Sequence, residues 1–167
     1  ARRDDGIKPE IGDVEPNFFN TTFTNYEMVA AENGKTFRFD NRIHRMIKTD
    51  KTLLKQLMTI LFDNALKYTD EDGVIELTIS ANDRNLFLKV SDNGPGISTA
   101  DKKKIFDRFY RVDKARTRQT GGFGLGLSLA KQITEALKGT IAVKDNKPKG
   151  TIFEVKIAIR TDNKKKK

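Results

Sequence analysis

The sequence predicts a single α/β (α+β) domain, built as a two-layer sandwich of helices packed on a sheet. Apolar residues recur at helical spacing in three stretches, 17–32, 51–68 and 127–137. Shorter stretches alternate apolar and polar residues, as half-buried strands do. The last alternating stretch gives the sheet one core side, formed by Phe153, Val155, Ile157 and Ile159.

Length and composition limit the classes of function that fit. The 167 residues suffice for one compact domain, and the absence of cysteine excludes disulfides and thiolate metal sites. No window approaches 18 consecutive apolar residues, so no membrane-spanning segment is expected in this chain. The net charge of +9 favours an anionic ligand or an acidic partner. No nucleic-acid-binding module is recognisable, so no nucleic acid partner is expected.

The N-terminal third is expected to hold a linker, a helix and two short strands. Residues 1–16 contain two glycines and two prolines that interrupt any regular element, which indicates a linker. The helix over 17–32 ends at Asn33-Gly34. Strands 36–39 and 45–48 then follow around a turn at Asp40-Asn41.

A long helix is predicted from the N-cap Asp50 to about Tyr68. Its expected apolar stripe consists of Leu53, Leu57, Ile60 and Leu61, followed by Asn64. An amide on such a stripe needs a hydrogen-bond partner, and Lys67 and Tyr68 lie on the same side of the helix. Two interpretations stay open: a ligand-binding group, or an asparagine paired with backbone beside a lysine that reaches for solvent.

A hairpin of strands 75–79 and 86–90 leads into Asp92 and the glycines 94 and 96. Asp92 is either part of an ordinary Asx-turn or a carboxylate aimed into a pocket. In the second case it is able to accept a hydrogen bond from an exocyclic amine, such as that of adenine.

The region 98–126 has the composition of a binding loop. Ser98 is expected to cap a short helix over 99–105, and the charged connection up to residue 119 reads as a lid or binding loop, or as a disordered segment. Four glycines within 121–126 then precede the third helix. Glycines before a helix N-terminus are typical of a phosphate cradle, with a flexible hinge as the alternative. A closing hairpin of 140–144 and 151–159 completes the chain.

Four motifs in this order resemble those of the ATP-binding catalytic (HATPase_c) domain of bacterial two-component sensor histidine kinases. Residues 61–69, Leu-Phe-Asp-Asn-Ala-Leu-Lys-Tyr-Thr, are similar to the N box. Residues 92–97 are similar to the G1 box, 105–113 to the F box and 121–127 to the G2 box. The sequence of residues 17–26 is also similar to that of one group of these kinases from Gram-positive bacteria. The resemblance implies the Bergerat (GHKL) fold, with a mixed sheet, helices on one face and an ATP lid.

The resemblance also implies roles for individual residues. Asn64 would coordinate Mg²⁺ on the ATP phosphates, Lys67 would contact phosphate, and Tyr68 would pack along the nucleotide. Asp92 would bind the adenine amino group, and Arg111 would reach the γ-phosphate. The catalytic set is thus Asn64, Lys67 and Arg111, with Asn64 the metal ligand. The complete expected ATP-binding set is Asn64, Lys67, Tyr68, Asp92, Gly94, Gly96, Ile97, Phe109, Arg111, Gly122, Gly124, Leu125, Gly126 and Leu127.

The expected function is transfer of the γ-phosphoryl group of ATP to a histidine on a dimerisation domain that this sequence lacks. The phosphate would then pass to an aspartate of a response regulator. Residues 1–16 would be the linker from that domain, 17–160 the catalytic domain, expected to be monomeric, and 161–167 a disordered basic tail. The domain would be the cytoplasmic part of a membrane-anchored sensor.

Two features depart from the family pattern. Most relatives carry a second N-box asparagine four residues before Asn64, where this chain has Ile60. The single histidine, His44, lacks the context of a phosphoacceptor and is expected at the surface or a sheet edge. The alternatives are an ATPase of the gyrase, Hsp90 or MutL type, whose general-base glutamate would stand at position 60, and a nucleotide-free interaction module.

Overall fold

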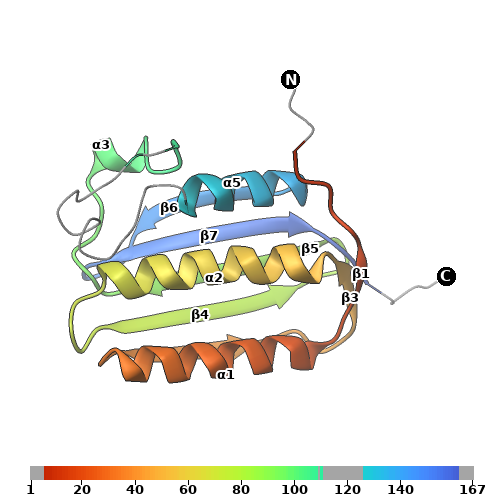
Figure 1. The fold of residues 1–167 in the computed structure, drawn as a ribbon, viewed down its shortest axis with the longest axis horizontal. Coiled ribbons are helices and arrows are strands. Elements are labelled where there is room, and N and C mark those ends of the chain that lie inside the picture. The colour runs from red at the N-terminus through yellow and green to blue at the C-terminus, as the bar shows by residue number, and fades with distance from the viewer. Residues whose placement is uncertain (1–5, 109, 111–125, 162–167) are drawn as a thin grey trace.

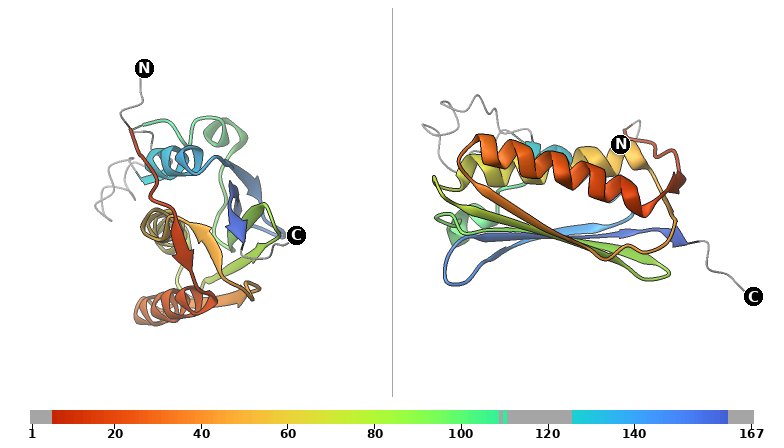
Figure 2. Two further views of the ribbon diagram at one scale, coloured as in Figure 1. Left: turned by 90° about the vertical axis from the view of Figure 1, so that its right-hand side faces the viewer. Right: turned by 90° about the horizontal axis from the view of Figure 1, so that it is seen from below.

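The protein folds into two layers, with three helices side by side on one face of a five-stranded sheet (Figures 1 and 2). A computed structural model describes residues 6–108, 110 and 126–161. The helices are α1 (Pro16–Glu32), α2 (Lys51–Tyr68) and α5 (Gly126–Ala136). The short helix α3 (Thr99–Lys102) lies at one end of the molecule. The predicted two-layer α/β class is confirmed.

The main sheet is mixed, as expected. Its strands are β2 (Thr36–Asn41), β4 (Val74–Ala81), β5 (Asn85–Asp92), β7 (Thr151–Ala158) and β6 (Thr140–Asp145), in that spatial order. β2 pairs with β4 in parallel, whereas the other neighbours are antiparallel. The predicted hairpins β4–β5 and β6–β7 are therefore confirmed.

A second, three-stranded sheet corrects two predictions. It consists of β1 (Gly12–Val14), β3 (Ile47–Thr49) and β8 (Arg160–Thr161), in the order β1-β3-β8. The predicted pairing of 36–39 with 45–48 is wrong, because β2 pairs with β4 and β3 with β1 and β8. The expectation that 1–16 holds no regular element is wrong at β1, where Val14 is fully buried. The division into linker, domain and tail stays a prediction.

Helix α2 lies at the centre of the helical layer and begins as predicted. The side chain of Asp50 accepts a hydrogen bond from the Leu53 backbone N–H at 2.9 Å. The buried face is rotated from the predicted stripe, however, because Leu53, Ile60 and Asn64 are only half-buried. The buried side chains are Leu54, Leu57, Met58, Leu61, Phe62 and Ala65. Asn64 therefore lies at the margin of the core, where a ligand has access to it.

Aromatic side chains join α1 to the sheet and to α2. Tyr26 stacks on Phe62 with ring centroids 4.3 Å apart, and its hydroxyl is 2.6 Å from Thr59 Oγ1. Phe23 packs against Phe37 of β2. Val29 of α1 lies off this face and is 38% exposed. These contacts hold α1 beside α2.

Candidate functional site

The described parts of the four sequence motifs lie at one end of the domain. The C-terminal end of α2, the end of β5, helix α3 and the start of α5 all gather on the side of the molecule where α3 lies (Figure 1). This brings the described N-box and G1-box residues close to the beginning of α5. Five expected ligand-binding residues lie outside the described residues: Phe109, Arg111, Gly122, Gly124 and Leu125.

Asp92 is a buried and hydrogen-bonded side chain of this region. It is 6% exposed, and its Oδ1 accepts hydrogen bonds from the backbone N–H groups of Gly94 at 2.9 Å and Thr151 at 3.3 Å. Burial raises the pKa of the Asp92 carboxyl above its ordinary value, and these two hydrogen bonds oppose the rise. Within the described residues no hydrogen bond reaches Oδ2. The bond from the Gly94 N–H forms the Asx-turn, whereas the use of Oδ2 as a ligand acceptor stays a prediction.

Gly94 brings this turn against the end of α2. A Cβ built on Gly94 would lie 2.6 Å from the backbone oxygen of Tyr68 and 3.3 Å from Thr69 Cα. No real side chain tolerates that approach to backbone atoms, so only glycine permits this packing. Gly96 has a positive φ of 85°, which favours glycine for a second reason. The glycines between Asp92 and Ile97 thus allow the turn to pack closely.

The end of α2 presents Asn64, Lys67 and Tyr68, all half-buried. No hydrogen bond joins the Asn64 side chain to another described residue, so the interpretation of a backbone-paired asparagine is not supported. Partial desolvation raises the pKa of the neighbouring Asp63 carboxyl, and the Lys67 ammonium opposes this rise. An amide without a hydrogen-bond partner among the described residues and an ammonium one turn further along suit a polar, anionic ligand.

Ile60 lies against the first residue of α5. A Cβ built on Gly126 would be 3.6 Å from Ile60 Cγ2, which is an ordinary packing distance. Leu127 follows half-buried, and Ala130 and Ile133 are fully buried further along α5. The place of the expected second asparagine is therefore occupied by apolar packing between α2 and α5.

Sequence reasoning missed the residues that hold Asp92 from the other side. The Asn146 side chain donates from Nδ2 to the Asp92 backbone oxygen at 2.8 Å. Gly150 has a φ of 111°, and a Cβ on it would lie 1.9 Å from the same oxygen. The sequence predicts only a hairpin turn over 146–150. Its sequence gives no signal of this contact, because the contact joins residues 54 positions apart.

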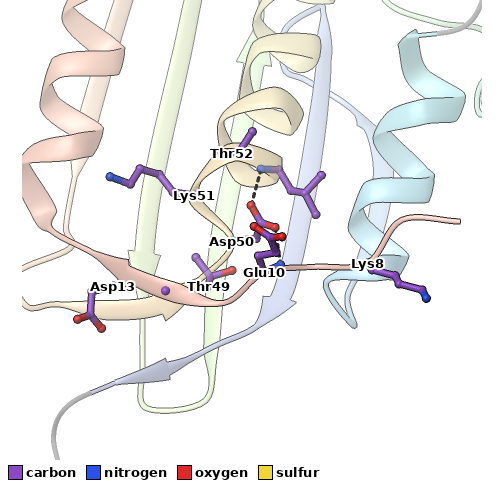
Figure 3. Close-up of a pocket in the computed structure, with 9 residues that line it drawn as sticks. Lys8, Glu10, Asp13, Thr49, Asp50, Lys51 and Thr52 are labelled. Atoms are coloured by element: carbon purple, nitrogen blue, oxygen red, sulfur yellow. Dashed lines mark hydrogen bonds between the residues drawn. The ribbon is translucent and has the colours of Figure 1, made fainter.

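A pocket of about 340 Å³ lies at the opposite end of α2 (Figure 3). It is formed by the segment before and within β1 and by the start of α2, including Glu10, Thr49 and Asp50. The Glu10 backbone N–H donates to Asp50 Oδ2 at 2.7 Å, which ties this segment to the N-cap of α2. The pocket contains none of the four motifs and is separate from the region around Asp92.

Three further observations concern metals, membranes and histidine. Among residues 6–108, 110 and 126–161, no three His, Cys, Asp or Glu side chains gather in a way that holds a metal ion. None of the helices in the described part of the chain is long and apolar enough to span a membrane. His44 is exposed, as predicted, in the connection between β2 and β3.

Known proteins resemble this chain in sequence. The family described as "Histidine kinase-, DNA gyrase B-, and HSP90-like ATPase" matches residues 49–161. Sensor protein CiaH of Streptococcus pneumoniae is 79% identical over 167 residues, which cover 100% of this chain and 38% of that protein. Sensor histidine kinase WalK of Bacillus subtilis is 37% identical over 136 residues, which cover 80% of this chain and 22% of that protein. The chain thus spans less than half the length of these relatives.

Solved structures resemble it in fold. Full-length ShkA in complex with AMPPNP superposes with a TM-score of 0.79 at 25% identity, over 95% of this chain and 33% of that one. The catalytic domain of histidine kinase ThkA gives a TM-score of 0.75 at 26% identity, over 89% of this chain and 97% of that one. ThkA in complex with response regulator protein TrrA gives 0.71 at 26% identity, over 90% of this chain and 42% of that one.

Proposed function

The chain belongs to the family of histidine kinase-, DNA gyrase B- and HSP90-like ATPases, and on this premise we propose that it binds Mg·ATP and presents the γ-phosphoryl group to a histidine. The resemblance to sensor histidine kinases expected from the four motifs is confirmed by the relatives, and the GHKL fold by the structures. The chain is accordingly the ATPase domain of a sensor kinase. The roles of its individual residues and its partners are proposed below.

The observation that carries the proposal is the buried Asp92 carboxylate. Two backbone N–H groups engage Oδ1, and Oδ2 remains to accept the 6-amino group of adenine. A carboxylate at 6% exposure is costly unless its oxygens find donors, so a ligand amine offsets part of that cost. Gly96 and Ile97 follow directly in the same turn, where they would line the base.

The phosphate end of the nucleotide would lie along α2 toward the start of α5. Asn64 and Lys67 would hold the phosphates, with Tyr68 beside the nucleotide, and Gly126 and Leu127 begin the helix that faces them. Arg111 and the glycine-rich residues Gly122 and Gly124 would complete the set. Mg²⁺, when bound, neutralises phosphate charge, and an amide oxygen such as that of Asn64 is a suitable hard ligand for it. Catalysis of this type consists mainly of positioning and charge neutralisation.

The phosphoacceptor would lie on a dimerisation domain of the same kinase, outside this sequence. His44 is a poor candidate for the phosphoacceptor, because it lies at the opposite end of the sheet from Asp92. β2 runs parallel to β4, and His44 follows the end of β2, whereas Asp92 pairs with Ile75 near the beginning of β4. A response regulator is the proposed next acceptor, and the complex of ThkA with TrrA supports that choice of partner. The parent protein would be a membrane-anchored sensor with this domain on the cytoplasmic side, and the isolated domain would be monomeric.

Calorimetric titration with the non-hydrolysable analogue AMPPNP, with and without Mg²⁺, tests the proposal. We expect micromolar-to-millimolar binding that Asp92→Asn weakens at least about tenfold, because the asparagine amide would face the adenine amine donor to donor. Asn64→Ala is expected to make binding insensitive to Mg²⁺. Asp83→Asn and Asn25→Ala are matched controls, because both residues are exposed and lie outside the four motifs. Absence of binding by the unchanged domain would favour the interaction-module alternative.

A second experiment separates the kinase from the ATPase alternative. Incubation with γ-labelled ATP is expected to leave the domain unlabelled and to yield negligible free phosphate. The reason is that Ile60 supplies no general base and the acceptor histidine is on another domain. Stable label on His44 would contradict the proposal, and Mg²⁺-dependent turnover near one per second would favour an ATPase.

A further inference from the structure

The turn between β6 and β7 contacts the backbone of Asp92 directly. Asn146 Nδ2 donates to the Asp92 carbonyl oxygen at 2.8 Å, and Asn146 Oδ1 accepts from the Lys147 backbone N–H at 2.8 Å. The two bonds use opposite ends of the amide, so they fix its orientation. The Asn146 backbone N–H closes the turn by donating to the Gly150 oxygen at 2.9 Å.

This side chain supplies a hydrogen bond that the sheet does not. The ladder between β5 and β7 ends at the pair Ser91–Ile152, one residue before Asp92. The carbonyl of Asp92 therefore lies beyond the last ladder pair, and a buried carbonyl without a partner is unfavourable. Asn146 provides the missing donor, and the absence of a side chain at Gly150 leaves the space for the Asp92 carbonyl group.

A second contact, from the last residue of β6, holds the other end of the loop that begins at Asp92. Lys102 Nζ donates to Asp145 Oδ1 at 2.8 Å and to the Ile97 backbone oxygen at 2.9 Å. The loop 92–97 is thus joined to the β6–β7 turn at its first and its last residue. Its middle is held by Gly94, which packs on the end of α2.

We propose that Asn146 is a positioning residue that sets how well Asp92 distinguishes adenine from other bases. The role rests on the proposed function, in which Asp92 receives the 6-amino group. The two hydrogen bonds to the Asp92 carboxylate come from the backbone N–H groups of Gly94 and Thr151, which a substitution does not remove. Asn146 instead holds Asp92 through a side chain, so its role is open to mutation. Asn146 would not touch the nucleotide and acts through Asp92.

The test compares ATP with ITP, which carries an oxo group in place of the 6-amino group and has the same phosphates. Asn146→Asp is nearly isosteric, keeps the acceptor for Lys147 N–H, and replaces the donor to Asp92 by an oxygen. Asn146→Ala removes both bonds. The control is Asn82→Ala, because Asn82 also holds a turn by accepting from the Arg84 and Asn85 N–H groups, at the other end of β5.

We expect both Asn146 variants to bind ATP about 3- to 10-fold more weakly, with a much smaller change for ITP, so that the ratio of the two affinities falls. Asn82→Ala should leave the ratio unchanged, and urea unfolding should show all three variants folded. Equal weakening of ATP and ITP would overturn the inference, and so would unchanged ATP binding. If the unmutated domain binds no ATP, the proposed function fails together with the inference. If it binds ATP and only the Asn146 result differs from expectation, the inference alone fails.

Discussion

Replacing Ile60 with asparagine tests how a second amide in the N box changes Mg²⁺-dependent nucleotide binding. Ile60 and Asn64 are one helical turn apart on α2 and both are half-buried at the margin of the core. The Ile60 side chain packs toward Gly126 at the start of α5, at a distance that leaves room for a side chain of similar size. An asparagine there would place a second amide oxygen next to that of Asn64.

The cost in stability follows from the burial of Ile60. Full burial of an isoleucine side chain is worth about 1.5–3 kcal/mol, so a half-buried one contributes about half of that. Adding a polar group that solvent or a ligand is able to reach brings the expected loss to about 1–2 kcal/mol. Small domains have unfolding free energies of about 5–15 kcal/mol, so the Ile60→Asn domain should remain folded. Urea unfolding measures this loss.

The expected gain is in the Mg²⁺-dependent part of nucleotide binding. A hydrogen bond or coordinating oxygen to a charged group is worth about 1.5–3 kcal/mol, which corresponds to about 10-fold or more in affinity. The ratio of AMPPNP affinities with and without Mg²⁺ should therefore rise about 10-fold in Ile60→Asn. Ile60→Leu is the matched control, because leucine resembles asparagine in shape and carries no oxygen. A folded Ile60→Asn domain with an unchanged ratio of the two affinities would refute the reasoning that Ile60 deprives the proposed Mg²⁺ site of a ligand oxygen.

The remaining predictions concern Asp92, Gly94 and Tyr26. Acidification should lower ATP affinity relative to ITP, because burial raises the pKa of the Asp92 carboxyl, so that it gains a proton at a higher pH than an ordinary aspartate and Oδ2 becomes a donor. Parallel titration of both nucleotides at falling pH measures the ratio of their affinities, and a constant ratio would contradict this prediction. Gly94→Ala should lower the unfolding free energy by about 1–3 kcal/mol in urea, because its Cβ meets the Tyr68 backbone; an unchanged midpoint would speak against the close contact. Burial raises the pKa of Tyr26 to about 12, so its contribution to stability is complete below about pH 10 and is lost between about pH 10 and 12. Tyr26→Phe should remove that loss.

The local elements were largely predictable because short-range signals specify them. The cap at Asp50 and the alternation in β4, β5 and β7 lie within a few residues of the structure they determine. The pairing of β2 and β3 was predicted wrongly for the opposite reason. Their nearness in sequence favours a hairpin, whereas the parallel partner of β2 lies beyond the whole of α2. Burial of Val14 in β1, against β3, similarly depends on long-range packing.

The candidate site shows the same division between local and long-range information. The spacing of Asn64, Lys67 and Tyr68 placed them together on α2, and the structure agrees. The support of Asp92 by the turn 146–150 was not predictable, because an asparagine in a hairpin turn is ordinary turn chemistry. The packing of Ile60 against α5 was not evident from the sequence either. An apolar stripe shows which face of a helix is buried, but it does not show which element packs on that face.

Asp92 also bears on the choice between a nucleotide-binding domain and a nucleotide-free interaction module. Its raised pKa means that the fold holds the ionised carboxylate at a cost, even with two backbone N–H groups on Oδ1. Asparagine would accept the same two hydrogen bonds through its own oxygen and would avoid the buried charge. On the proposed function, the second carboxylate oxygen would serve binding rather than the stability of the turn. A ligand that brings a donor to Oδ2 explains why residue 92 is an aspartate, whereas a nucleotide-free interaction module offers no reason for the buried charge.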